Sequence, residues 1–92
     1  MKVIQTPTFK KTIKKLQANQ KKAVDEAVKA IMANPLIGDT KVGDLAGILV
    51  HKFKMTKQLT LLAYSYQDDV VTLTLLALGT HENFYRDLKR SS

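Results

Sequence analysis

The first third of the chain has apolar residues spaced as on amphipathic helices. Thr6 and Pro7 predict a helix start, because threonine can cap a first turn and proline fits the first helical position. The apolar positions that follow are Phe9, Ile13 and Leu16. After a polar break at residues 17–20, a second amphipathic stretch runs to Asn34-Pro35, with its apolar face at Val24, Ala27, Val28 and Ile31. The pattern predicts a hairpin of two helices.

The second half of the chain has the composition and alternation of β-strands. Three runs rich in Val, Leu, Thr and aromatic residues cover residues 48–55, 59–66 and 70–78. Turns are expected at Thr56-Lys57 and at residues 67–69, and a short edge strand at Val3-Ile4. The three glycines of residues 35–47 predict a loop. The order indicates an α+β domain, in which the helical hairpin packs on an antiparallel sheet of about four strands, followed by a short C-terminal helix.

The first long strand, residues 48–55, has one face that turns from apolar to cationic. Side chains alternate between the two faces of a strand, so Val50, Lys52 and Lys54 share one face. His51 and Phe53 share the other. We therefore interpret His51 as a core or sheet-surface residue, and the two lysines as candidates for binding an anion.

Composition excludes several classes of protein. The 92 residues are 45% hydrophobic and predict a single globular domain spanning residues 1–92. There are no cysteines, and the two histidines and eight acids are scattered, so we expect no metal site and no cofactor. The longest apolar stretch, residues 70–78, is too short to span a bilayer, and the N-terminus lacks the pattern of a secretory signal. We expect a cytoplasmic protein without a membrane partner.

The net charge of +7 is unevenly distributed. The first thirty residues contain only two acids, Asp25 and Glu26, against eight lysines at positions 2, 10, 11, 14, 15, 21, 22 and 29. A second stretch, residues 45–67, contains no acid and carries Lys52, Lys54 and Lys57. Such asymmetry favours an anionic partner such as nucleic acid, an acidic protein or a membrane surface. For the N-terminal lysines, a solvated helix face is the alternative interpretation.

The segment after the last strand combines a titratable group with an aromatic one. Residues 70–78 lead into Gly79, and a short amphipathic helix is expected to begin there. His81 and Tyr85 are four residues apart and would share one face of that helix, beside an apolar face marked by Phe84 and Leu88. An imidazole and a phenol would thus stand together at the end of a sheet in a basic protein.

These residue types suit metal-free cleavage of RNA. The neighbouring 2′-hydroxyl is the nucleophile, and the reaction needs a base, an acid and cations for the charge that develops on phosphate. His81 is the candidate acid or base because its pKa lies near neutrality. Lys52 and Lys54 would stabilise charge, and Tyr85 would stack on a base or orient the phosphate. In the alternative interpretation His81 is a neighbour of the helix N-cap and Tyr85 only packs.

The order of elements and several short motifs resemble the RelE/ParE superfamily of toxins from type II toxin–antitoxin pairs. The motifs are Leu45-Ala46-Gly47 before a basic strand, LLAY ending at Tyr64, and GTHENFY at residues 79–85. The last is most similar to the ending of the YafQ-like branch, G-[ST]-H-x-x-[LF]-[FY]. The resemblance implies a RelE-like fold and places a ribonuclease site on His81, Tyr85, Lys52 and Lys54.

The resemblance leaves two main functions open. The first is an endoribonuclease that cleaves messenger RNA, with the ribosome as a further partner and with Lys57, Arg86 and Arg90 contacting nucleic acid. The second is a non-catalytic ParE-like toxin that inhibits DNA gyrase. A third is a family member that only binds RNA or an antitoxin. RelE-like ribonucleases usually carry arginine in the third strand, whereas residues 58–60 offer none. Each toxin version implies a cognate acidic antitoxin.

Overall fold

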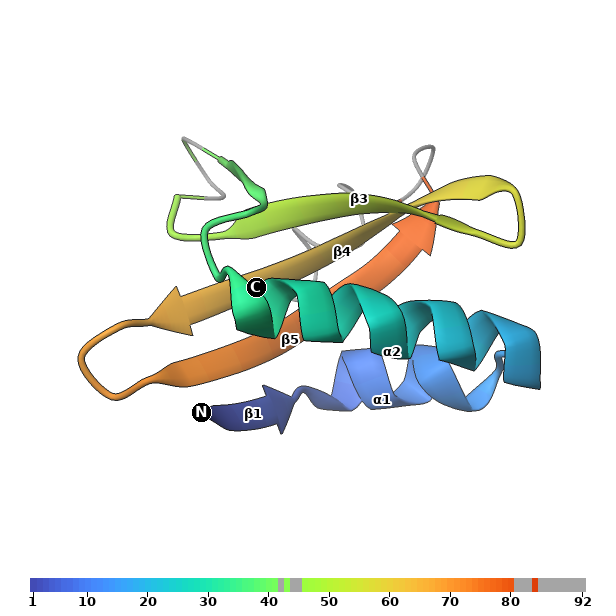
Figure 1. Ribbon diagram of the computed structural model, residues 1–92, viewed down its shortest axis with the longest axis horizontal. Coiled ribbons are helices and arrows are strands. Elements are labelled where there is room, and N and C mark those ends of the chain that lie inside the picture. Colours follow the sequence, from blue (N-terminus) through green and yellow to red (C-terminus); the bar gives the residue numbers. More distant parts are fainter. Residues whose placement is uncertain (42, 44–45, 81–83, 85–92) are drawn as a thin grey trace.

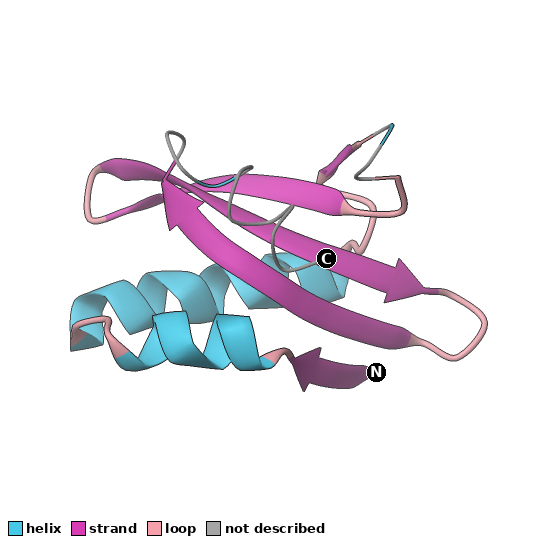
Figure 2. Ribbon diagram, turned by 180° about the vertical axis from the view of Figure 1, so that it is seen from behind, coloured by secondary structure: helices cyan, strands magenta, loops and turns pink. Residues whose placement is uncertain are grey.

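The computed structural model describes residues 1–41, 43, 46–80 and 84. Two helices, α1 (Pro7–Lys14) and α2 (Ala18–Ala33), lie side by side against one face of a five-stranded sheet (Figure 1). The strands lie in the spatial order β1-β5-β4-β3-β2, and their bounds are β1 Lys2–Gln5, β2 Asp39–Thr40, β3 Leu49–Met55, β4 Gln58–Gln67 and β5 Thr72–Thr80. Figure 2 shows the sheet from the side opposite the helices. We call this second surface the open face.

The helical hairpin, the edge strand at Val3-Ile4 and the three long strands confirm the predicted α+β order. The prediction of an antiparallel sheet of about four strands was wrong in two respects. Strand β1 pairs with β5 in parallel, so the sheet is mixed, and β2 adds a fifth strand. Two residues within a glycine-rich loop are too few to show a strand pattern, which is why β2 escaped prediction.

Some boundaries differ from those expected. Helix α2 begins at Ala18, inside the predicted break, because Gln20 Oε1 accepts a hydrogen bond from the backbone N–H of Gln17 at 2.8 Å and closes the first turn. Val71 has a positive φ of 46° and belongs to the turn, so β5 begins two residues later than predicted. The strand also continues past Gly79 to Thr80. The expected C-terminal helix lies outside the described residues, except for Phe84.

The main core lies between the helices and the sheet. Helix α1 packs on β5 and α2 packs on β3. The largest side chains of this core are Phe9 and Ile31 from the helices and Tyr64 from β4, each no more than 2% exposed. Strand positions that face the helices alternate with positions on the open face, as the period of a strand requires. The alternation therefore decides, for each strand residue, whether its side chain faces the helices or the open face.

A β-bulge in β5 changes which residues reach the open face. Tyr64 pairs with Leu75 and Ala63 pairs with Ala77, so Leu76 has no partner in the register. Before the bulge Leu75 faces the helices, and after it Ala77 joins the cluster on the open face. The extra residue therefore sets the alternation of the last part of β5. Without it, the residues of odd number beyond the bulge would face the helices.

Tyr64 fastens the loop that leads from α2 into β2. Its buried hydroxyl donates a hydrogen bond to the carbonyl of Pro35 at 2.7 Å and accepts one from the N–H of Gly38 at 3.0 Å. A Cβ at Gly38 would come within 2.8 Å of that hydroxyl and 3.1 Å of the Val50 backbone. Position 38 thus needs glycine for space. The loop lies directly on the sheet as a result.

Candidate functional site

The open face carries the lysine pair that the sequence pattern placed together. Lys52 pairs with Leu61, which pairs with Gly79, so these three residues form one row across β3, β4 and β5. Lys54 pairs with Leu59 in the next row on the same face. Residues two apart on a strand are separated by about 7 Å. The predicted shared face of Lys52 and Lys54 is therefore confirmed.

Both lysines are exposed and have room to meet an anion. Among the described residues, neither Lys52 nor Lys54 makes an ion pair or a hydrogen bond through its side chain. Lys57 follows in the turn between β3 and β4 and is exposed as well. No acid occurs between residues 45 and 67 to neutralise these charges locally. The arrangement is suited to a phosphate backbone and not to a structural ion pair.

The turn that carries Lys57 is a tight two-residue hairpin. Met55 and Gln58 are the last paired residues, and both central residues have positive φ, 48° for Thr56 and 72° for Lys57. Such a turn matches the twist of the flanking strands, although it more often contains Asn and Gly. The Thr56 hydroxyl donates to the Met55 carbonyl at 2.7 Å. The third lysine is thereby held at the end of the same hairpin as the other two.

The floor beside the lysines is apolar and covered by Phe84. A small cluster on the open face unites the buried residues Val50, Leu61, Ala63, Ala77 and Phe84. Phe84 is 3% exposed, and its ring would lie 3.5 Å from a Cβ built on Gly79. The predicted apolar role of Phe84 is confirmed. Phe84, five residues after Gly79 in the sequence, therefore lies on the open face.

His81, Tyr85, Arg86 and Arg90 lie outside the described residues. Their proposed roles, like those of Lys52, Lys54 and Lys57, stay predictions.

His51 lies apart from the lysines, as predicted. It is partly buried on β3, and its ring stacks on that of Phe53 with centroids 6.1 Å apart and planes at 11°. Phe53 packs against the core under the helices. Burial lowers the pKa of His51 from its ordinary value of 6.5. His51 therefore lies on the helix side of the sheet and does not join the candidate site.

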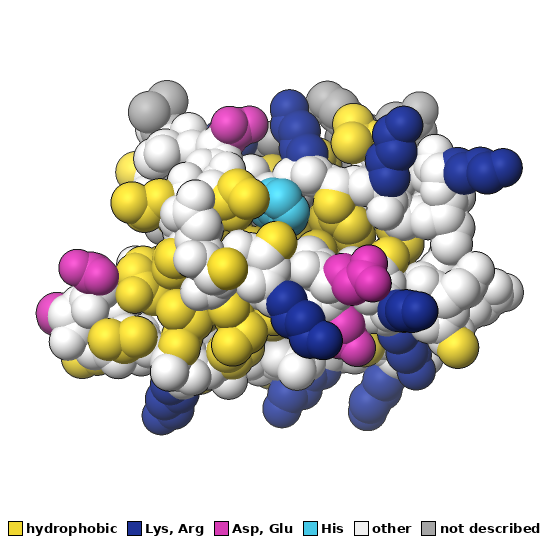
Figure 3. Space-filling view, in the orientation of Figure 1, with side chains coloured by type: hydrophobic (Ala, Val, Ile, Leu, Met, Phe, Trp, Pro, Cys, Tyr) yellow, Lys and Arg dark blue, Asp and Glu magenta, His cyan; other side chains and the backbone are white. Residues whose placement is uncertain are grey.

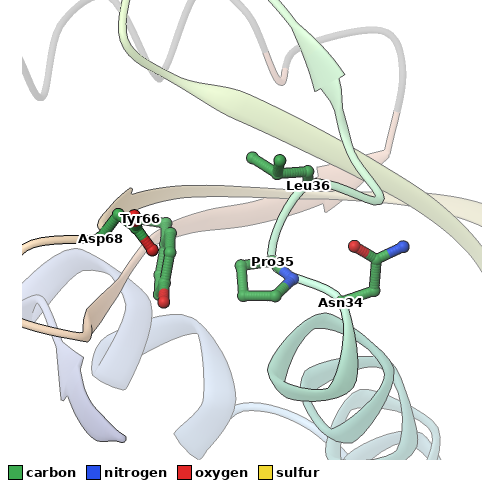
Figure 4. A pocket seen from close by; sticks show the side chains of 5 residues that line it. All are labelled: Asn34, Pro35, Leu36, Tyr66 and Asp68. Atoms are coloured by element: carbon green, nitrogen blue, oxygen red, sulfur yellow. The ribbon is translucent and has the colours of Figure 1, made fainter.

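Sequence reasoning missed a hollow on the helix side of the molecule. It measures about 370 Å³ and is lined by Asn34, Pro35, Leu36, Tyr66 and Asp68 (Figure 4). Its lining includes one carboxylate and no cation, so its chemistry differs from that of the lysine face. Only the Pro35 turn after α2 could have hinted at it.

Among the described residues, no three or more His, Cys, Asp or Glu side chains gather to hold a metal ion. No described helix has the length and apolarity to cross a membrane.

Residues 3–89 match the family described as ParE-like toxin of type II bacterial toxin–antitoxin system. The chain belongs to this family. The comparison with curated proteins gave no match. The confirmed family agrees with the RelE/ParE resemblance of the sequence motifs, whereas the YafQ-like branch stays a prediction.

Solved structures show where the toxin's fold recurs. It is similar to a mutant of the E. coli toxin RelE in the free state, with a TM-score of 0.75 and 14% identity, covering 98% of this chain and 90% of that chain. The toxin–antitoxin complex RelBE2 from Mycobacterium tuberculosis gives a TM-score of 0.74 at 24% identity, covering 87% of this chain and 96% of that chain. The YoeB/ParE toxin from Agrobacterium tumefaciens gives a TM-score of 0.73 at 16% identity, covering 88% of this chain and 99% of that chain. The toxin therefore has a RelE-like α+β fold.

Proposed function

We propose that the toxin is a metal-independent endoribonuclease that cleaves messenger RNA on the ribosome. The observation that carries this proposal is the exposed pair Lys52 and Lys54 on the open face. They have no ion-pair partner among the described residues, and the row of Lys52 leads across the sheet to Gly79, two residues before His81 in the sequence. A gyrase-binding toxin transfers no proton and stabilises no phosphate charge, so it has no catalytic need for such a lysine pair.

The proposed reaction is an attack of a ribose 2′-hydroxyl on the adjacent phosphate. One group removes the 2′-hydroxyl proton, the bond to the 5′-oxygen breaks, and another group protonates that oxygen, which leaves a 2′,3′-cyclic phosphate and a 5′-hydroxyl. His81 is assigned as the acid or base. Lys52 and Lys54 stabilise the negative charge that develops on the phosphate oxygens. Tyr85 stacks on a base or orients the phosphate.

The ribosome is part of the proposal because a protein of 92 residues has little surface with which to hold a message by itself. Three lysines along one hairpin supply charge but little shape, so a second surface has to hold the message in place. Lys57, Arg86 and Arg90 are assigned to contacts with nucleic acid. The antitoxin is proposed as an acidic polypeptide, because its partner carries a net charge of +7. One structural neighbour is the intact E. coli RelBE toxin–antitoxin complex.

Inhibition of DNA gyrase without catalysis is the second candidate. Two observations favour it: the matching family is named after ParE, and the residues of β4 opposite the lysines, Leu59 and Leu61, are apolar where an arginine would serve a ribonuclease. If the toxin inhibits gyrase, the open face binds that protein and no residue on it transfers a proton. The two functions predict different damage in a cell, cut transcripts or broken DNA.

The test is a double variant, Lys52→Ala/Lys54→Ala, with Lys2→Ala/Lys29→Ala as its control. The control removes the same charge from two exposed lysines away from the pair: Lys2 is on the edge strand β1, separated from β3 by β5 and β4, and Lys29 is on α2. Each variant is induced briefly, and growth and RNA 5′ ends are measured at matched soluble levels. We expect the control to arrest growth and generate new 5′ ends, and the test variant to do neither. Equal arrest and equal cleavage by both would place the site elsewhere.

A further inference from the structure

The hollow on the helix side of the molecule lies between two segments that are far apart in the sequence. Asn34, Pro35 and Leu36 lie at the C-terminal end of α2 and just after it. Tyr66 lies near the end of β4, and Asp68 in the turn between β4 and β5. Figure 4 shows Tyr66 and Asp68 on one side of the hollow and Pro35 and Leu36 on the other. The volume of about 370 Å³ falls within the range of ligand sites, about 300–1,000 Å³.

The surroundings of this hollow are negative in a protein that is strongly basic overall. The two segments that line it belong to residues 30–40 and 58–80, and neither stretch contains a lysine or an arginine. Asp68 has no ion-pair partner among the described residues, and a second acid, Asp69, follows it. Helix α2 has no basic residue in its last turn, so nothing within the helix offsets the negative end of its dipole at Asn34. The hollow therefore favours a cation over a phosphate group.

The Tyr66 ring makes arginine the best-suited cation. A guanidinium group is planar, stacks on an aromatic ring and can pair with a carboxylate through two parallel hydrogen bonds. Tyr66 is partly buried and packs against the core, which holds its ring in place. Figure 4 places the Asp68 side chain beside this tyrosine. A lysine ammonium would pair with Asp68 but would lack the planar contact with the ring.

Exposed apolar side chains continue from both sides of the hollow. Leu36 is 75% exposed and Ile37 43% on one side, and Val70 is 59% and Val71 44% exposed in the turn after Asp68. In the space-filling view, yellow side chains cover this end of the molecule, and magenta ones mark its tip (Figure 3). An exposed apolar group with a polar rim is typical of an interaction site. A small molecule that filled only the hollow would leave these side chains in water, so the surface favours a polypeptide.

We propose that the hollow is a docking site for an arginine side chain of a partner polypeptide, in a segment where apolar residues flank that arginine. The guanidinium would stack on Tyr66 and pair with Asp68, and the flanking residues would pack on Leu36 and Val70. Arginine is enriched at the centres of protein interfaces, where lysine is depleted. The proposal goes beyond the proposed cleavage and holds whether or not the open face is catalytic, because Tyr66 and Lys52 lie on opposite faces of the sheet.

The test is a titration of the full ¹⁵N-labelled chain with short peptides, followed through the NMR signals of its backbone amides. The probe is acetyl-Ser-Leu-Arg-Leu-Ser-amide, and in two comparison peptides lysine or glutamine replaces the arginine. Asp68→Asn removes the proposed partner of the guanidinium. Asp69→Asn is the matched control, because it removes the same charge from the neighbouring residue, which does not line the hollow. Leu36→Ser removes an exposed apolar contact without opening the core.

We expect the arginine peptide to shift the amide signals of Leu36, Tyr66 and Asp68 until they saturate, at peptide concentrations of up to about 10 mM. The glutamine peptide should bind about fivefold or more weakly, with the lysine peptide between the two. Asp68→Asn should weaken binding of the arginine peptide by about the same factor and remove its advantage over the glutamine peptide. Leu36→Ser should weaken all three peptides alike, whereas Asp69→Asn should bind them as the parent does.

Four other results would each overturn the proposal. Signals that do not shift, or do not saturate, would show that the hollow binds no such peptide. Equal weakening by Asp68→Asn and Asp69→Asn would show a general attraction between charges. Equal shifts with arginine amide alone would show a site for a free cation, and equal shifts with a single-stranded RNA would show a site for nucleic acid. Message cleavage is scored separately with the Lys52/Lys54 variant, so either idea can fail alone.

Discussion

The hydroxyl of Thr6 joins the start of α1 to Leu76, the residue of β5 that has no partner in the sheet register. It donates to the Leu76 carbonyl at 2.9 Å and accepts from the N–H of Phe9 at 3.2 Å. The Thr6 N–H also donates to the Leu75 carbonyl at 3.1 Å. One side chain thus caps the helix and donates a hydrogen bond to the carbonyl of the bulged residue. Because the bulge decides which residues of β5 reach the open face, Thr6 supports the site from the other end of the chain.

Replacing Thr6 with valine should destabilise the fold by about 2 kcal/mol. Valine has the same shape but can neither cap the helix, typically worth about 1 kcal/mol, nor satisfy the Leu76 carbonyl, worth about as much again. Urea unfolding measures the change. Thr8→Val is the control, since Thr8 is exposed and its side chain makes no hydrogen bond with a described residue. A loss no greater than that of the control would mean that the shared hydroxyl contributes little.

The Tyr64 clamp predicts a second loss of stability. In Tyr64→Phe the Gly38 N–H and the Pro35 carbonyl would both lose their partner beside a fully buried ring, and each unsatisfied group costs about 1–3 kcal/mol where water cannot reach it. We expect a total near the lower end, about 2 kcal/mol, because the loop is only partly buried.

Tyr66→Phe controls for the removal of a tyrosine hydroxyl. Tyr66 is half-buried, and its hydroxyl has no hydrogen-bond partner among the described residues. Both variants are compared by urea unfolding and by amide hydrogen exchange at Gly38 and Asp39. Exchange at Gly38 should accelerate only in Tyr64→Phe. Unchanged exchange would show that the loop is held by other contacts.

Strand alternation and capping residues predicted the parts of this fold that depend on neighbours in sequence. The shared face of Lys52 and Lys54 follows from strand alternation alone, and the Thr6-Pro7 helix start from capping chemistry. The parallel pairing of β1 and the bulge at Leu76 could not be predicted in this way. They depend on contacts such as that between Thr6 and Leu76, which are 70 residues apart in the chain. The lysine half of the candidate site was therefore predictable, whereas the alternation of β5 leading to it was not.

His51 predicts how stability depends on pH. Burial lowers the pKa of His51 below its ordinary value of 6.5, so the unfolded chain binds this proton more readily than the folded one. The contribution of His51 is therefore fully present above pH 6.5 and is lost as the pH falls through that value toward the folded pKa. His51→Gln cannot titrate in this range. The free energy of unfolding of the parent should fall relative to that of His51→Gln between about pH 7.5 and about pH 5. A constant difference would show that the imidazole titrates equally in both states.

His81 separates the two proposed functions. A ribonuclease needs a group that transfers a proton, and removal of such a group typically slows the reaction by about 10²–10⁴-fold. Glutamine keeps the size and hydrogen bonding of histidine but does not titrate near neutrality. His81→Gln should therefore stop message cleavage and growth arrest, while folding and antitoxin binding persist. His51→Gln serves as the control, because His51 lies on the helix side of the sheet, and it should remain toxic.

An inhibitor of gyrase moves no proton, so in that case His81→Gln would still arrest growth, and the cells would show DNA damage with intact transcripts. Transcript integrity and a DNA-damage reporter, read together at matched soluble levels, decide between a site that cuts RNA and a surface that binds gyrase.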